Sequence, residues 1–214
     1  MKRKLRVAII CGGKSVEHEI SLQSAKNVIE AIDKDGYDVV LIGIDKEGCW
    51  HLQNLADFEE EMKSSALPHI TSQGDEVAFI PAGAGQLINV TTGEKLQKVD
   101  VVFPILHGPC GEDGTVQGLL KIADVPFVGT GVLGSAIAMD KEVSKRLLKE
   151  AGIPTAKFLS FTSEKKKKID FHQVINHLGL PLFVKPNSLG SSVGMSKVKR
   201  EEEFLPALEK AFRY

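Results

Sequence analysis

The stretch LRVAIICGG, residues 5–13, decides the fold of this chain, because an apolar run of strand length ends there in two glycines. After it, apolar residues recur at helical spacing from Leu22 to Ile32. A second candidate for a buried strand, YDVVLIGI, follows at residues 37–44. The order strand, loop, helix, strand is typical of a parallel sheet. We therefore predict an α/β fold built on a parallel sheet.

Later stretches extend this pattern. VDVVFPILHG, residues 99–108, predicts a central strand, and a helical pattern follows at residues 115–123. A further helix is expected from Asp140, a favourable N-cap residue, to Ala151. Residues 45–98 are polar and lack strong periodicity, so we expect them to form a peripheral elaboration.

A smaller unit follows, and we place the domain boundary near Thr130. Its expected elements are a strand at 155–161 (TAKFLSF), a helix near 171–178, a strand, loop and strand at 182–198, and a final helix that includes residues 204–212.

Composition limits the function classes. The formal net charge is -1, which gives no global positive field to attract nucleic acid. The three cysteines follow no Cys-x-x-Cys spacing, so the sequence supports neither a disulfide framework nor a zinc site. The longest uncharged run, from Val125 to Met139, is too short for a membrane span. We expect a soluble intracellular protein without a nucleic-acid or membrane partner.

Two loops follow predicted strands, at the edge of an α/β sheet where ligands collect. The first contains Glu17, whose acid could hold a substrate ammonium group or merely complement a helix dipole. The second, HGPCGEDG, places His107, Glu112 and Asp113 among glycines at the end of a buried strand. A structural role explains this density of polar groups less well than a binding role does.

A third loop lies in LFVKPNSLGSSVGMSKV, residues 182–198. It is not a Walker A motif, yet small residues allow backbone N–H groups to point at one anion, and Lys185 would add a charge. A plain hairpin with a solvated lysine is the alternative, and the residues alone leave both open. GTGVLG, residues 129–134, matches Gly-x-Gly-x-x-Gly, but it follows several strands instead of the first one, which argues against a dinucleotide site.

Taken together, four stretches resemble the D-alanine–D-alanine ligases, bacterial enzymes of the ATP-grasp class. They are, in order, GGKSVEHEIS, LHGPCGEDGTVQG, GTGVLGSAIAMDK and PLFVKPNSLGSSVGMSKV. The resemblance implies an N-terminal, Rossmann-like, substrate-binding domain at residues 1–130 and the first α+β lobe of an ATP-grasp domain at residues 131–214. It also implies ATP and two D-alanine molecules as ligands, D-alanyl-D-alanine for peptidoglycan as the product, and a cytoplasmic location. Whether the protein forms a homodimer is left open.

The resemblance further assigns substrate roles to four residues by motif position. Glu17 would anchor the ammonium group of the first D-alanine, and Ser191 would hydrogen-bond to Glu17 and order the site. His107 and Glu112 would orient the substrate pocket.

The nucleotide roles follow in the same way. Lys141 and Lys185 would bind the ATP phosphates, since cations must offset the repulsion when a carboxylate is phosphorylated. The backbone that would cover the phosphates belongs to Ser192, Val193, Gly194 and Met195.

Members of the family are considerably longer than this chain. The resemblance therefore implies that the second ATP-grasp lobe, with its Mg²⁺ ligands, is not among these 214 residues. We expect no metal ligands in this chain and no dipeptide formation by it alone. The alternatives are a D-alanine–D-lactate or D-alanine–D-serine ligase, and a non-catalytic fragment that binds a nucleotide or a partner.

Overall fold

The computed structural model describes residues 3–64, 69–72 and 74–214. It divides into two compact units, Met1–Ala136 and Ile137–Tyr214, and each is described by itself. Residues 65–68 and 73, which belong to the stretch predicted to be peripheral, lie outside the described residues. The domain boundary near Thr130 and the roles given to the two domains stay predictions.

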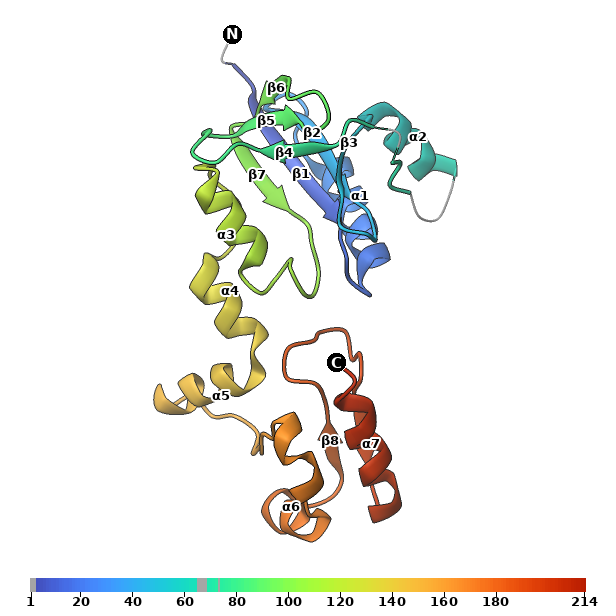
Figure 1. Cartoon of the computed structure of the whole chain (residues 1–214), viewed down its shortest axis with the longest axis vertical. Helices are drawn as coiled ribbons and strands as arrows, with labels where there is room; N and C mark the ends of the chain where they lie inside the picture. The colour runs from blue at the N-terminus through green and yellow to red at the C-terminus, as the bar shows by residue number, and fades with distance from the viewer. Residues whose placement is uncertain (1–2, 65–68, 73) are drawn as a thin grey trace. The chain divides into compact units, whose positions relative to one another are not determined.

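The first unit is built on a four-stranded sheet in the order β3-β2-β1-β7 (Figure 1). β1 (Leu5–Gly12) lies parallel to both β2 (Tyr37–Ile44) and β7 (Val101–Pro104). β3 (Trp50–Gln53) runs antiparallel at the edge beside β2. The predicted parallel α/β sheet is confirmed.

Alternate residues of β1 face two separate cores, as the period of a strand requires. Val7, Ile9 and Cys11 pack with α1 (His18–Ala31) and α2 (Leu55–Ser64). Ala8 and Ile10 pack on the other face with Val116 and Leu120 of α3 (Thr115–Ile122). Both faces of β1 are therefore covered, which explains why residues 7–12 form an unbroken apolar run.

Described parts of residues 45–98 belong to both cores, so the expectation of a peripheral elaboration was wrong. They supply β3 and a three-stranded antiparallel sheet of β4 (Val77–Phe79), β5 (Gln86–Asn89) and β6 (Lys95–Lys98). Val77, Phe79 and Leu87 of that sheet are buried against the main sheet and α3. The strands are only three or four residues long, too short to show a period.

The second unit contains α5 (Lys141–Glu150), α6 (Phe171–Leu178), the antiparallel pair β8 (Leu182–Val184) and β9 (Ser196–Val198), and α7 (Phe204–Ala211). Two 3-10 helices, η1 (Ser163–Lys168) and η2 (Glu201–Glu203), precede α6 and α7. α6, the hairpin and α7 share one core around Val174 and Val198. Asp140 caps α5 as predicted, accepting a hydrogen bond from Val143 N at 2.9 Å.

Two features of this region differ from the sequence prediction. Residues 155–161 form no strand, because the only ladder in the described part of this unit joins β8 to β9 and gives them no partner. An additional helix, α4 (Val132–Met139), occupies the Gly-rich stretch before α5.

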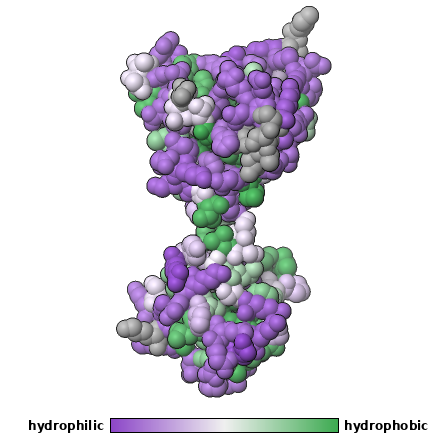
Figure 2. All heavy atoms as spheres, turned by 90° about the vertical axis from the view of Figure 1, so that its right-hand side faces the viewer, coloured by the Kyte–Doolittle hydropathy of each residue, from purple (hydrophilic) through white to green (hydrophobic). Residues whose placement is uncertain are grey.

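No described helix has the length and apolar character needed to span a bilayer. The view in Figure 2 shows mainly hydrophilic residues on the surface of the first unit that faces the reader.

Candidate functional site

The loop after β1 is shaped by glycine. Gly12 has φ 88°, and a Cβ there would lie 2.2 Å from the carbonyl oxygen of Ile44, so only glycine fits. Gly13 N donates to the same oxygen at 2.8 Å, and the Gly13 carbonyl contacts His18 Nδ1 at 2.9 Å. The loop is thus fixed to the end of β2 and to the first turn of α1.

Glu17 is placed at the start of α1, yet its side chain does not cap the helix. Only 6% of its surface is exposed. A Cβ built on Gly108, in the loop after β7, would lie 2.6 Å from Glu17 Oε2, so the carboxylate sits directly against that glycine. The helix-dipole explanation is a better description of Glu19, whose side chain is about half exposed and pairs with Lys46 at 2.5 Å.

The loop after β7 is held by its own carboxylates. Glu112 is exposed, and its Oε2 accepts from Gly108 N at 2.7 Å. Asp113 accepts from Cys110 N at 2.8 Å and from Thr115 N at 3.0 Å. Burial would raise the pKa of Asp113, but these hydrogen bonds outweigh it and hold the pKa below its usual value. Glu112 and Asp113 therefore order the loop through these hydrogen bonds, and Asp113 does so as an anion.

His107 lies at the exit of β7 and is half-buried. Its Nε2 is 3.0 Å from Ser24 Oγ on α1. The structure thus brings Glu17, His107 and Glu112 together around Gly108, at the carboxyl ends of β1 and β7.

Ser21 joins the two strand ends and was missed by the sequence analysis. Its fully buried hydroxyl accepts from Gly12 N at 2.8 Å and donates to the carbonyl oxygen of Ile105. The signal that could have revealed it was present: Ser21 and Ser24 are polar residues three apart on the face of α1 that carries Leu22 and Ala25.

Cys11 is a fully buried residue of the first core at this edge, and we predict that it is not a nucleophile. Burial raises the pKa of its thiol to about 12, so the thiolate does not form at neutral pH.

The second unit carries the other predicted group. β8 and β9 are joined by residues 185–195, so the loop does connect a hairpin, but it is far longer than a tight turn. Ser191, Ser192 and Gly194 have φ values of 45°, 62° and 70°. This left-handed backbone is strained for serine, and such strain is frequent at ligand-binding loops.

Lys141 is attached to this loop from α5. Its Nζ donates to the carbonyl oxygens of Asn187, at 3.0 Å, and of Leu189. Asn187 also accepts from Glu142 N through its side chain at 2.9 Å, a role that the sequence analysis did not recognise. Together these bonds fix the start of α5 against the loop.

Lys141 and Lys185 form a concentration of positive charge. The pKa of Lys141 is lowered, first by partial burial and then by the charge of Lys185, while Asp140 raises it. Lys185 is exposed, and within the described residues no hydrogen bond or ion pair holds its ammonium group. Two like charges kept near each other beside a strained loop make a favourable place for an anion.

Metal ligands do not gather in the part of the chain that the structure describes. Among those residues no group of three or more His, Cys, Asp or Glu side chains could hold a metal ion.

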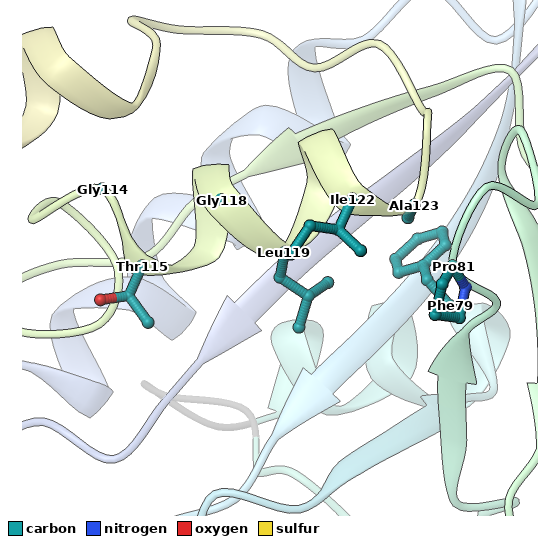
Figure 3. Close-up of a pocket in the computed structure, with 8 residues that line it drawn as sticks. All are labelled: Phe79, Pro81, Gly114, Thr115, Gly118, Leu119, Ile122 and Ala123. Carbon is teal, nitrogen blue, oxygen red and sulfur yellow. The ribbon is translucent and has the colours of Figure 1, made fainter.

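A groove of about 520 Å³ lies elsewhere on the first unit, along α3. Figure 3 shows its lining, which includes Leu119, Ile122, Phe79 and Pro81 and contains no charged side chain. It offers no chemistry for a polar substrate, so we place the candidate sites at the strand ends and at the hairpin loop.

Comparison with known proteins identifies the family of this chain. The family signature described as the N-terminus of D-ala D-ala ligase matches residues 6–130, and that of the C-terminus matches residues 147–214. This chain belongs to the D-alanine–D-alanine ligase family. The resemblance drawn from the four sequence stretches is confirmed.

Curated relatives carry the same name. The D-alanine–D-alanine ligase of Shouchella clausii is 51% identical over 212 residues, and D-alanine–D-alanine ligase A of Escherichia coli K12 is 49% identical over the same number. Each alignment covers 99% of this chain but 58% of the relative. The chain thus spans less than two thirds of the length of the ligases it matches.

Solved structures show the same fold. The D-alanine–D-alanine ligase of Coxiella burnetii has a TM-score of 0.84 at 33% identity, over 99% of this chain and 61% of that one. The VanG D-Ala:D-Ser ligase of Enterococcus faecalis has a TM-score of 0.82 at 33% identity, over 99% and 60%. The predicted class, the N-terminal part of an ATP-grasp ligase fold, is confirmed.

Proposed function

We propose that the protein carrying this chain joins two D-alanine molecules with ATP. The observation that carries the proposal is sequence identity. Across 99% of the chain, about half of the residues are identical to those of relatives named D-alanine–D-alanine ligase. One D-alanine carboxylate would attack the γ-phosphate of ATP, giving an acylphosphate and ADP. The amine of the second D-alanine would then displace phosphate from the carbonyl carbon. No protein nucleophile is needed, which fits the inert thiol of Cys11.

The first D-alanine would bind at the strand ends of the first unit. A buried carboxylate such as that of Glu17 suits an ammonium group, because little water competes for it. Glu112 and His107 would keep the loop around Gly108 in shape. The proposed bond from Ser191 to Glu17 stays a prediction.

ATP would bind through the second unit. Lys141 and Lys185 would neutralise phosphate charge, and the backbone of residues 192–195 would approach the phosphates. We assign no residue of this chain to Mg²⁺, because the described residues offer no ligand group for it. The reaction would take place in the cytoplasm, where ATP is available.

The test is dipeptide formation and ADP release by purified protein that carries these residues, with ATP, Mg²⁺ and D-alanine. Glu17→Gln should raise the KM for D-alanine by roughly tenfold or more, since a charge-assisted bond contributes about 1.5–3 kcal/mol, and should leave the KM for ATP unchanged. Glu19→Gln is the matched control, because Glu19 is a half-exposed acid in the same helical turn. If Glu17→Gln and Glu19→Gln changed the KM for D-alanine equally, Glu17 would have no role beyond its interaction with the helix dipole.

The nucleotide assignment is tested separately. Lys185→Ala should raise the KM for ATP by roughly tenfold or more, because it removes a charge-assisted bond to phosphate, and it should leave the KM for D-alanine unchanged. Lys197→Ala, which removes an exposed lysine from β9 of the same hairpin, is the control. An unchanged KM for ATP in Lys185→Ala would restore the plain hairpin interpretation.

A second candidate is a D-alanine–D-serine ligase, since the VanG D-Ala:D-Ser ligase is as similar in structure as the D-alanine–D-alanine ligases are. Competition between labelled D-alanine and D-serine as the second substrate decides between them. A product that is mostly D-alanyl-D-serine would replace the first proposal.

A further inference from the structure

The hydrogen bonds of Ser24 bear on the chemistry of His107. Ser24 Oγ lies 2.9 Å from the carbonyl oxygen of Ile20, one turn earlier in α1, and donates its proton to it. The same oxygen lies 3.0 Å from His107 Nε2. A hydroxyl has one proton, so an oxygen that donates to Ile20 presents only lone pairs to the imidazole. In this arrangement His107 carries a proton on Nε2, whereas a hydroxyl turned toward the imidazole would leave the ring proton on Nδ1.

We propose that Ser24 is a positioning residue that keeps neutral His107 in the tautomer protonated at Nε2. Nδ1 is then the ring nitrogen that is left to accept a hydrogen bond. In the described residues no hydrogen bond engages Nδ1 of His107. The ligand that would use it is the ammonium group of D-alanine, which is rich in N–H donors; this part rests on the proposed function.

The surroundings support a positioning role. His107 directly precedes Gly108, the glycine against which the Glu17 carboxylate lies. The Glu17 carboxylate against Gly108 and an imidazole acceptor on the preceding residue would together recognise a group that has several N–H donors. The bond to Ser24 also persists if His107 becomes protonated on both nitrogens, because Nε2 still donates. Ser24 therefore fixes the ring plane in either state of Nδ1.

Ser24 does this from a rigid element. It lies near the middle of α1, whose residues Leu22, Ala25 and Ile29 are buried in the first core. The neighbouring Ser21 ties the same helix to the ends of β1 and β7. The imidazole is thus oriented by a side chain with little freedom to move.

The experiment reads the tautomer directly by two-bond ¹⁵N–¹H correlation of the imidazole in the 214-residue chain, with His107→Gln to assign the signals. We expect the Nε2-protonated pattern in the wild type, a mixture in Ser24→Ala, and recovery in Ser24→Thr, which keeps the hydroxyl. Gln23→Ala, a change in the same helical turn that contacts Asn27 instead of His107, should leave the pattern unchanged. A proton on Nδ1 in the wild type, or no change in Ser24→Ala, overturns the proposal.

A kinetic arm tests the role toward substrate in the protein that carries this chain. Ser24→Ala should raise the KM for D-alanine by roughly five- to tenfold, the value of one ordinary hydrogen bond, and leave the KM for ATP unchanged, with recovery in Ser24→Thr. An unchanged KM for D-alanine would remove the substrate role of Nδ1. Should the protein show no ligase activity at all, the proposed function fails, while the tautomer measurement still decides the role of Ser24. If Ser24→Ala does not fold, Ser24→Cys takes its place, because a thiol is only a weak hydrogen-bonding group, and an unchanged tautomer there overturns the proposal.

Discussion

Replacing Ser21 with alanine should destabilise the first unit more than any other single hydroxyl deletion in α1. Ser21 Oγ is the buried partner of both Gly12 N and the Ile105 carbonyl oxygen. The change removes both bonds and leaves a donor and an acceptor at the ends of β1 and β7 without a partner. It creates only a small void, since one oxygen atom is lost.

The size of the effect follows from these groups. Each bond contributes about 1 kcal/mol net, and a buried group without a partner costs about 1–3 kcal/mol. Alanine is favoured over serine in a helix by about 0.5 kcal/mol, which offsets part of the loss. Two such groups, less the gain in helix propensity, should lower the free energy of unfolding by about 1.5–5.5 kcal/mol, or the melting temperature by roughly 5–20 °C for a unit of this size.

Trp50 makes the measurement specific to the first unit. It is the single tryptophan of the chain, and its ring packs against Phe79 with centroids 6.4 Å apart. Urea titration followed by its fluorescence therefore reports unfolding of this unit. Ser24→Ala is the control, because it gives the same gain in helix propensity and removes a hydroxyl that is only half-buried. A loss in Ser21→Ala no larger than in the control would refute the reasoning.

Three further predictions concern other parts of the chain. Gly108→Ala should raise the KM for D-alanine, because the added Cβ would displace the Glu17 carboxylate. Gly93→Ala is the control: Gly93 has a similar φ of 70°, but no atom lies within 4 Å of the Cβ that the change would add, so this variant shows the effect of backbone strain alone. Equal effects of the two on KM would argue against the contact. Lys185→Met should raise the pKa of Lys141, because one charge that lowers it is removed; an NMR titration of the Lys141 side chain that shows no rise would contradict this. Burial raises the pKa of Asp45, but its hydrogen bonds lower that pKa by more. The ionised carboxylate therefore stabilises the fold above about pH 4. This stabilisation is lost as the pH falls through the depressed pKa. Asp45→Asn should therefore reduce the loss of stability between pH 5 and pH 3 in the tryptophan assay, and an unchanged loss would count against it.

The central sheet could be predicted from the sequence because burial on both faces leaves a clear signal. β1 and β2 contain the apolar runs 7–12 and 39–44, and the two strands pair in register from Leu5 and Tyr37 onward. The strands of residues 45–98 could not be predicted, since each has three or four residues and gains its burial from distant partners. The same limit explains the wrong strand at 155–161. Its apolar residues have strand propensity, but a strand forms only where another backbone pairs with it.

The sequence was enough to identify the polar residues of the candidate site, but it could not predict the contacts that they make. Glu17, His107 and Glu112 stood out because they are polar residues at predicted strand ends, and the structure places them around one glycine. That glycine, Gly108, is what permits the close approach, and no local pattern indicates which of several glycines in a loop will meet a carboxylate 91 residues away in sequence. A contact of that kind is a property of the sheet, because parallel strands bring the loops that follow them to one edge.

The serines of α1 show how the scaffold controls the chemistry. Ser21 joins the ends of β1 and β7, and Ser24, one turn later, bonds to the imidazole that follows β7. Both hydroxyls belong to a helix whose apolar residues are packed against β1, so the distance between the two loops depends on that packing. A shift of α1 would therefore change the setting of Glu17 and His107 together. This is why we expect changes on the core face of α1, far from any ligand, to alter the use of D-alanine before they alter the use of ATP.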